Sequence, residues 1–149
     1  MIVEARGLVR TYAMPRTSLR QGPPSVQALR GVDLSVGRGE RFGIVGESGS
    51  GKTTLARLLL ALDQPQAGEV RFEGQQVSGR KERELRFLRR RAQIVFQDPM
   101  GSLDPRMRVR QILLEPLRAL AVPGDHLARV RELLAAVGLP ADAAERYPH

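Results

Sequence analysis

Residues 46 to 54 combine glycine, lysine and hydroxyl side chains at the spacing of a phosphate-binding loop. The pattern G-x-x-x-x-G-K-[ST] is matched by Gly46, Glu47, Ser48, Gly49, Ser50, Gly51, Lys52 and Thr53, and Thr54 follows it. Glycines let successive backbone N–H groups turn inward toward a β-phosphate, and a helix beginning at Lys52 or Thr53 adds the positive end of its dipole. The pattern therefore predicts binding of a nucleotide through its phosphates.

Lys52 is one of only two lysines in the chain, and it stands where the pattern requires one. Its ammonium is predicted to neutralise the β- and γ-phosphate oxygens, which makes Lys52 a candidate catalytic residue. The Thr53 hydroxyl is predicted to hold Mg²⁺, and Thr54 to bond the α-phosphate. The competing interpretation is a glycine-rich turn before an amphipathic helix.

The segments around this loop have the order that the motif needs, a strand before it and a helix after it. The short apolar run Phe42 to Val45 predicts a buried strand, and Thr53 to Leu62 has a helical composition that ends before Pro65 and Gly68. Other patterns in the first half predict strands at Met1–Leu8, Val26–Val36 and Glu69–Phe72, a loop at Met14–Ser25 and a turn at Gly74.

Two further segments are predicted after this first half. Arg80 to Arg91 has charges of both signs four residues apart, which favours an exposed helix. Ala92 to Phe96 predicts a second short apolar strand, and the proline at position 99 ends it before a loop that runs to Pro105.

A final helix is predicted near the end of the chain. Asp125 is its expected N-cap, and Gly138 and Pro140 stop it. Its apolar face is formed by Leu127, Val130, Leu133, Leu134 and Val137.

Composition excludes several classes of function. The chain has 149 residues, enough for one domain, and no cysteine, which rules out disulfides, thiolate metal sites and a cysteine nucleophile. Its two histidines are too few for a histidine metal cluster. The net charge of +8 attracts polyanions without selecting among them, and the longest apolar stretch, Leu58 to Leu62, is far shorter than a membrane span.

Three segments extend the motif beyond the loop: Gly46–Arg57, Pro65–Gly74 and Val95–Pro99. Together they closely resemble the ATP-binding subunit of ABC transporters. The stretch Phe96–Pro105, with Gly101–Arg106, and the short segment Glu115–Leu117 resemble the branch that imports oligopeptides, dipeptides or nickel. The resemblance covers essentially the whole chain.

The resemblance implies an α/β fold. The expected fold is an incomplete P-loop NTPase core of the ABC nucleotide-binding type, with an N-terminal antiparallel β subdomain and the start of a helical subdomain. Residues 1–98 are expected to hold the β subdomain and the core up to the Q-loop, and residues 99–149 the start of the helical subdomain. The LSGGQ signature would follow His149, so we expect the N-terminal half of a longer subunit or a truncated product.

The resemblance also assigns roles to two residues outside the loop. Tyr12 matches the aromatic residue that stacks on adenine, and its alternative is a packed tyrosine at a strand end. Gln97 matches the Q-loop glutamine, a candidate catalytic residue that contacts Mg²⁺ or the attacking water; its alternative is an ordinary polar loop residue. ATP and Mg²⁺ are the cofactors that the resemblance implies.

The implied function is ATP hydrolysis coupled to import of peptides or nickel through a membrane permease. The loop Asp98 to Arg106 is expected to contact the permease, and a second ATP-binding subunit and an extracytoplasmic binding protein complete the complex. Such a subunit lies in the cytoplasm, on the inner face of the membrane. Without the signature and Walker B residues, these 149 residues alone are expected to bind ATP with negligible hydrolysis.

Other interpretations remain open. Ile94 to Asp98 resembles a Walker B strand in which Asp98 holds Mg²⁺ through water, although Pro99 stands where this family would have a glutamate. A non-hydrolysing nucleotide-binding protein and a small P-loop kinase are the alternative functions. Nucleic-acid binding is not expected, because Arg80 to Arg91 has no interleaved aromatic residue apart from Phe87.

Overall fold

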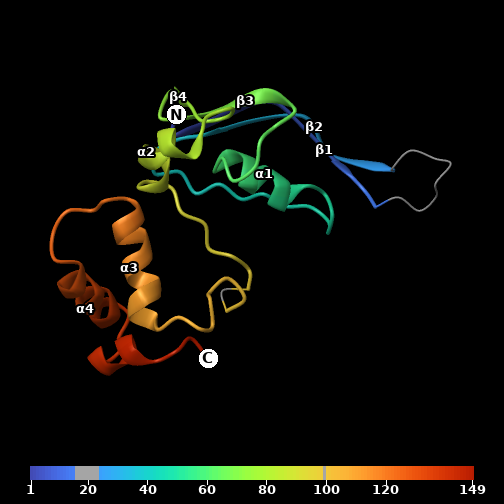
Figure 1. Cartoon of the computed structure of the whole chain (residues 1–149). Coiled ribbons are helices and arrows are strands. Elements are labelled where there is room, and N and C mark those ends of the chain that lie inside the picture. Colours follow the sequence, from blue (N-terminus) through green and yellow to red (C-terminus); the bar gives the residue numbers. More distant parts are fainter. Residues whose placement is uncertain (16–23, 99) are drawn as a thin grey trace. The chain divides into compact units, whose positions relative to one another are not determined.

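The structure is a computed structural model that describes residues 1–15, 24–98 and 100–149 (Figure 1). This part of the chain divides into two compact units, Met1–Ala92 and Gln93–His149. Each unit has a hydrophobic core made of its own residues. The phosphate-binding motif lies in the first unit.

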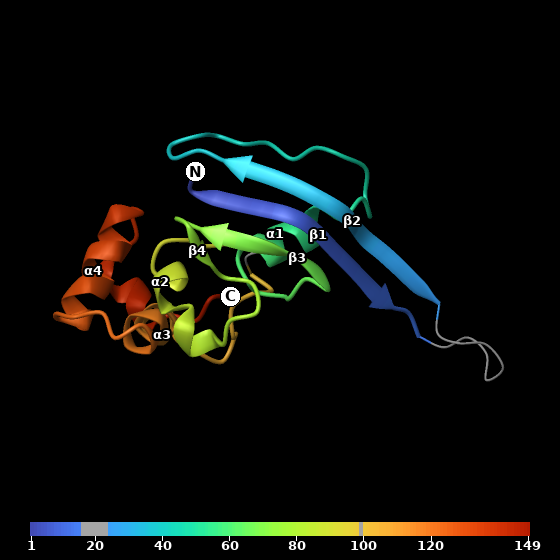
Figure 2. The same cartoon turned by 90° about the horizontal axis from the view of Figure 1, so that it is seen from above.

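The first unit is built on an antiparallel sheet of four strands in the order β2-β1-β3-β4 (Figure 2). The strands are β1 (Val3–Ala13), β2 (Ser25–Val36), β3 (Ala67–Phe72) and β4 (Gln75–Gln76). The three strands predicted for this region are confirmed, and β1 is longer than predicted. Alternation along β1 and β3 buries Ala5, Val70 and Phe72 on one face of the sheet.

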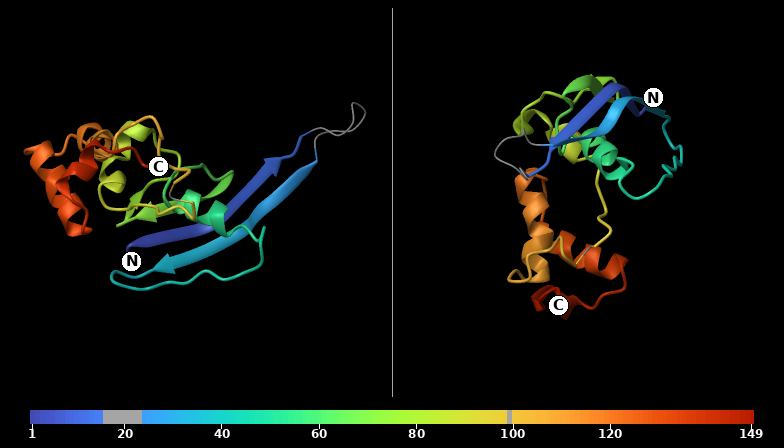
Figure 3. Two further views of the ribbon diagram at one scale, coloured as in Figure 1. Left: turned by 90° about the horizontal axis from the view of Figure 1, so that it is seen from below. Right: turned by 90° about the vertical axis from the view of Figure 1, so that its right-hand side faces the viewer.

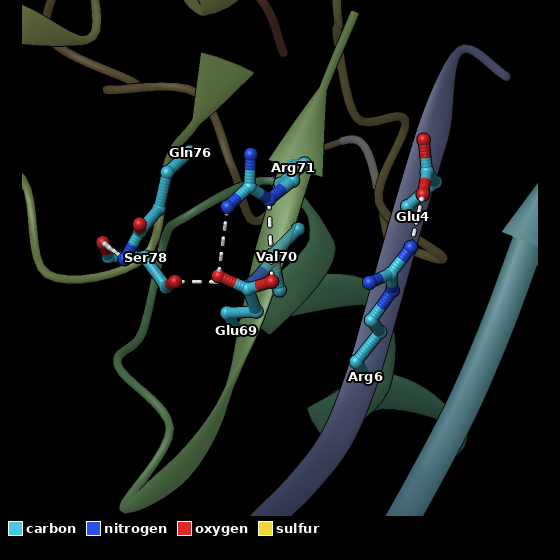
Figure 4. A network of polar contacts seen from close by, with 7 residues as sticks. All are labelled: Glu4, Arg6, Glu69, Val70, Arg71, Gln76 and Ser78. Atoms are coloured by element: carbon cyan, nitrogen blue, oxygen red, sulfur yellow. Dashed lines mark hydrogen bonds and ion pairs between the residues drawn. The ribbon is translucent and has the colours of Figure 1, made fainter. Parts of the chain in front are cut away.

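The other face of β1 and β3 is charged (Figure 4). Glu4 stands opposite Arg71, and Arg6 opposite Glu69, so that charges of opposite sign face each other across the strands. Along each strand, Arg6 pairs with Glu4 and Arg71 with Glu69, both at 3.2 Å. Because a one-residue slip of either strand would turn its two charges toward the core, the two faces together fix the register of the strands.

β1 and β2 continue beyond β3 as a two-stranded ribbon (Figure 3). The last pair between β1 and β3 joins Val9 and Ala67. Beyond it, the side chain of Gln66 takes the place of a strand partner, since it accepts a hydrogen bond from Thr11 N at 2.5 Å and donates one to Thr11 O at 3.2 Å. The loop predicted at Met14–Ser25 falls mainly on residues 16–23, outside the described residues.

α1 (Lys52–Leu59) lies across the apolar face of the sheet and buries Leu55 and Leu58 against it (Figures 1 and 2). The predicted helix is confirmed, but it ends three residues earlier than Leu62. The chain turns at Ala61, whose φ is 49°, and Leu62 N donates to Arg57 O at 2.8 Å. This left-handed cap closes the last turn of α1 and directs the chain toward β3.

The turn predicted at Gly74 is confirmed as a two-residue hairpin between β3 and β4. Glu73 and Gly74 both have positive φ, 47° and 78°, which matches the twist of the flanking strands. The Glu73 carboxylate forms ion pairs with Arg38 and Arg91, and the hydrogen bond from Arg38 is the main cause that holds its pKa below the ordinary value.

Two predicted strands are wrong. Phe42–Val45 and Ala92–Phe96 have no partner in a sheet among the described residues, and Phe42, Val45 and Val95 are 48%, 97% and 91% exposed. An apolar run of this kind becomes a strand only when neighbouring strands pair with its edges and helices cover its faces. The sequence pattern reports the apolar run and not the neighbours that it needs.

The helix predicted at Arg80–Arg91 is wrong in its length. The structure has a 3₁₀ turn at Glu82–Glu84 and a short α2 at Arg86–Arg89. Leu85 and Leu88 are buried in the core of the first unit, so packing rather than helix propensity fixes this segment.

The second unit consists of α3 (Val109–Ala119), α4 (His126–Ala136) and a 3₁₀ turn at Ala141–Glu145. The predicted N-cap of α4 is confirmed, since the Asp125 carboxylate accepts hydrogen bonds from Leu127 N at 2.9 Å and Ala128 N at 3.0 Å. No element was predicted where α3 lies. The core of this unit is formed by Leu114, Val130, Leu134 and Ala143. In the described ranges, no helix is long and apolar enough to cross a membrane.

Candidate nucleotide-binding site

The candidate phosphate-binding loop connects the segment after β2 to α1. Its backbone turns at Glu47 to Ser50, where Ser50 N donates to Glu47 O at 3.2 Å. Gly49 and Gly51 have φ of 81° and 92°, the left-handed conformation that glycine adopts without strain. The predicted glycines therefore produce the tight curl that a phosphate-binding loop requires.

Gly51 is required for a second reason, which is its close approach to β2. A Cβ atom at this position would lie 2.5 Å from the carbonyl oxygen of Ala28 and 3.1 Å from the Leu29 side chain. The loop thus ends against the middle of β2, and α1 starts there. The contact with β2 therefore fixes the position of the N-terminus of α1.

Lys52 has its ammonium turned back over the loop. Its Nζ donates to the carbonyl oxygens of Gly46 at 2.7 Å and Glu47 at 2.6 Å, and to the Ser50 hydroxyl at 3.2 Å. These three contacts hold the positive charge at the centre of the curl. Phosphate oxygens entering the loop would meet this ammonium and the backbone N–H groups together.

The N-terminus of α1 has no side-chain cap. Gly51 occupies the N-cap position, and neither a capping hydrogen bond nor an acidic residue is present in the first turn. Thr53 is exposed there, and Thr54 is half-buried. The backbone N–H groups and the dipole of α1 are therefore matched to an anion that the protein itself does not supply.

The donor chemistry also fits a magnesium ion held together with phosphate. Mg²⁺ prefers oxygen ligands, keeps several waters and is commonly bound by few protein groups plus the phosphates of a substrate. The exposed Thr53 hydroxyl offers one such oxygen at the first turn of α1. The described residues contain no group of three or more carboxylate or histidine side chains that would bind a metal by themselves.

Tyr12 lies near the end of β1 and is brought close to the loop by the sheet. It pairs with Val26 of β2, and its neighbour Thr11 pairs with Gln27, which precedes the Ala28 carbonyl that Gly51 approaches. The backbone of Tyr12 therefore faces a position of β2 that is two residues from Ala28, where the phosphate-binding loop ends. The structure brings Tyr12 and the loop into one region of the first unit.

The Tyr12 side chain is held by two residues that the sequence analysis did not find. Its hydroxyl donates to Asp63 Oδ2 at 2.8 Å, and Arg10 Nη2 pairs with Asp63 Oδ1 at 2.9 Å. The Arg10 guanidinium carbon lies 4.7 Å from the centre of the Tyr12 ring. A usable signal for Arg10 was its two-residue spacing from Tyr12, which places both side chains on the same face of a strand.

The electrostatics of Asp63 follow from these contacts. Partial burial alone would raise the pKa of the Asp63 carboxyl, but hydrogen bonds from Tyr12 and from Gln64 N, together with the charge of Arg10, outweigh burial and lower it. Asp63 is therefore an ionised acceptor for the Tyr12 hydroxyl at neutral pH.

Gln97 and the predicted permease-contacting loop belong to the second unit. Gln97 is exposed, and the described part of this loop turns through a hydrogen bond from Gly101 N to Asp98 Oδ1 at 3.1 Å. Asp104 pairs with Arg106 at 3.1 Å. The described part of the loop is thus locally ordered by its own carboxylates.

Comparison with protein families gives a match to the ABC transporter family over residues 29–148. A putative oligopeptide transport ATP-binding protein of Bacillus subtilis is 47% identical over 84% of the chain, which spans 39% of that relative. A putative peptide import ATP-binding protein of Brucella ovis is 41% identical over 99% of the chain, which spans 45% of it. The chain therefore spans less than half the length of these curated relatives.

Solved structures give the same result for the fold. The ATP-binding cassette MJ0796, in a dimeric post-hydrolysis state bound to ADP and Pi, superposes with a TM-score of 0.79 at 26% identity. The match covers 98% of this chain and 61% of that one. The predicted fold class, an incomplete P-loop NTPase core with an antiparallel β subdomain, is confirmed by this likeness.

Proposed function

The chain belongs to the ABC transporter family, and on this premise we propose that residues 1–149 form the ATP-binding portion of an ATPase subunit that drives import through a membrane permease. The observation that carries the proposal is the position of Lys52. Its ammonium is held by loop carbonyls in front of an uncapped helix N-terminus, where an anion is the missing partner.

In this proposal, different residues of the loop contact different phosphates of the nucleotide. Backbone N–H groups of Gly46 to Gly51 surround the β-phosphate, and Lys52 reaches the β- and γ-phosphate oxygens. Thr54 bonds the α-phosphate. The adenine base stacks on the ring of Tyr12, and the pairing of Tyr12 with Val26, two residues from Ala28, supports this role.

Thr53 and Gln97 are the proposed magnesium contacts. Bound Mg²⁺ would neutralise charge on the phosphate oxygens as the terminal phosphoryl group is transferred to water. Thr53 supplies a hydroxyl oxygen from the first turn of α1, and Gln97 an amide oxygen from the Q-loop. Residues 1–98 accordingly hold the nucleotide-binding part, and residues 99–149 begin the helical subdomain.

Peptide is the proposed cargo, in preference to nickel, because the relatives named above are a peptide and an oligopeptide transport protein. The proposed partners are the permease, contacted through Asp98 to Arg106, a second ATP-binding subunit and, indirectly, an extracytoplasmic binding protein. The proposed location is the inner face of the cell membrane. Residues 1–149 alone bind ATP without appreciable turnover, because phosphoryl transfer needs further groups that position water.

Titration of the 149-residue chain with MgATP tests the proposal. The chain has only two lysines, so Lys81→Ala is a charge-matched control for Lys52→Ala. Lys52→Ala removes a charge-assisted contact with the phosphates and is expected to weaken the affinity for ATP at least about tenfold. Lys81→Ala is expected to bind like the wild type.

Two results would contradict the proposal. An equal loss of ATP affinity in both lysine variants would show that ATP binding depends on the net charge of the chain and not on the loop. Rapid hydrolysis by the wild-type chain would show that it already holds a complete catalytic site.

A further inference from the structure

We propose that Asp63 and Arg10 are positioning residues that fix the Tyr12 ring for stacking on the nucleotide base. The inference rests on the proposed function, because it concerns the base that accompanies the phosphates. It assigns a role to two residues that lie 53 positions apart in the sequence and that the phosphate-binding motif does not include.

The first step of the argument is the hydrogen bond at the tip of the ring. A tyrosine side chain near the end of a strand can rotate about χ1 and χ2 unless its hydroxyl is held. Tyr12 donates to Asp63 at 2.8 Å, and Asp63 is itself fixed because its other oxygen accepts Gln64 N at 2.7 Å and pairs with Arg10 at 2.9 Å. The ring plane is therefore set before any ligand arrives.

The second step is the occupation of one ring face. The Arg10 guanidinium lies over the ring at 4.7 Å from its centre, and the Arg10 side chain is only 23% exposed. Its Nε is shielded from water and has no hydrogen-bond partner in the described part of the chain. A base can then stack only on the opposite face, which removes one of two binding geometries.

The third step is the origin of Asp63. It follows the left-handed cap that ends α1, the same helix whose N-terminus forms the phosphate site. α1 therefore connects the two ends of the proposed nucleotide site, with Lys52 at its start and the anchor of Tyr12 four residues beyond its last residue, Leu59. The distance between the phosphate-binding loop and the Tyr12 ring is therefore fixed by one rigid element, α1.

Binding of MgATP and of magnesium tripolyphosphate, which lacks base and sugar, separates positioning from a purely structural role. Asp63→Ala is expected to weaken the affinity for ATP about threefold to tenfold, because stacking on the base is lost. The affinity for tripolyphosphate is expected to stay within about twofold of the wild type, because this ligand has no base. Tyr12→Phe keeps the ring, loses the hydroxyl, and is expected to give a similar loss for ATP alone. The double variant is expected to match Asp63→Ala, since both changes remove one interaction.

Glu73→Ala is the matched control, because Glu73, like Asp63, is a carboxylate of the first unit that forms an ion pair with arginine. It is expected to leave the ratio of ATP to tripolyphosphate affinity unchanged. Three results would each overturn the inference. Asp63→Ala could weaken the affinity for ATP and for tripolyphosphate equally, or it could leave the affinity for ATP unchanged. The double variant could weaken the affinity for ATP by the product of the two single effects.

Failure of the inference is distinguishable from failure of the proposed function. ATP affinity that depends on Lys52 but not on Asp63 rejects positioning and keeps nucleotide binding, whereas a wild-type chain without ATP affinity rejects both. If Asp63→Ala does not fold, Tyr12→Phe decides by itself: a loss for ATP alone supports positioning, and unchanged ATP binding overturns it.

Discussion

At the scale of single residues, Gly68 and Gly74 have the same left-handed backbone and different surroundings. Their φ values are 87° and 78°. A Cβ atom at Gly68 would lie 2.4 Å from the carbonyl oxygens of Arg6 and Gly7, whereas nothing lies within 4 Å of one at Gly74. Only Gly68 is therefore required both for its conformation and for the close contact between β1 and β3.

Alanine substitutions should separate these two requirements. Gly74→Ala is expected to cost about 1 to 2 kcal/mol of unfolding free energy, the usual penalty for a left-handed L-residue. Gly68→Ala adds a clash with backbone atoms and is expected to cost at least about 3 kcal/mol. Urea denaturation of the two variants measures the difference, and equal costs would show that β3 can shift away from β1.

Asp63 gives a pH prediction at the same scale. Its pKa is lower in the folded chain than the ordinary 3.8, so its contacts stabilise the fold above that value and are lost as pH falls through the lowered pKa. We expect Asp63→Asn to have a lower melting temperature than the wild type at pH 7, and this difference to become smaller in the acid range. Melting curves recorded from pH 7 to pH 3 measure the difference. A difference that grows toward acid pH would contradict the prediction.

At the scale of elements, Ser78 fixes the edge of the sheet (Figure 4). It is a buried polar residue of the first unit, and its hydroxyl accepts a hydrogen bond from Val70 N of β3 at 3.0 Å. Val77 N donates to Val70 O at 2.9 Å, so the segment after β4 satisfies both backbone groups of Val70. A serine side chain thus continues the pairing where β4 ends.

Removing this hydroxyl should destabilise the first unit. Ser78→Ala leaves the buried Val70 N–H without an acceptor, which is expected to cost about 1 to 3 kcal/mol. Ser35→Ala on β2 is the control, because Ser35 is exposed and its loss should stay within about 0.5 kcal/mol. Denaturation of both variants tests this, and equal costs would show that another acceptor reaches Val70.

At the scale of the whole molecule, the two units have separate cores. Leu58 is 1% exposed in the first core, and Leu134 is 2% exposed in the second. Burial of apolar side chains supplies most of the stability of each unit, and the second unit has few such residues. Each core should therefore respond mainly to substitutions among its own residues.

Hydrogen exchange can test this separation. Leu58→Ala and Leu134→Ala each create a cavity expected to cost about 2 to 5 kcal/mol. Protection is expected to fall in β1, β3 and α1 for Leu58→Ala, and in α3 and α4 for Leu134→Ala. A uniform loss of protection over the whole chain in either variant would show one cooperative unit instead of two.

The sequence by itself determined the features whose signal is local. The glycine, lysine and threonine pattern predicted the loop and the start of α1, alternation predicted the first strands, and Asp125 predicted the N-cap of α4. For the loop and the N-cap, the residues that form the structure are within a few positions of one another, so backbone conformation and neighbouring hydrogen bonds fix the outcome without distant partners. For the strands, the alternation is local, but the pairing that completes them joins residues far apart in the sequence.

Only the tertiary structure decided the features that depend on distant residues. Phe42–Val45 and Ala92–Phe96 have the pattern of buried strands, but the described chain gives them no strand partners, and Val45 and Val95 are almost fully exposed. The contact of Asp63 with Arg10 and Tyr12 depends on α1 crossing the sheet, which no local pattern encodes. Pairing and packing are properties of residues far apart in sequence, so they appear only when the chain is folded.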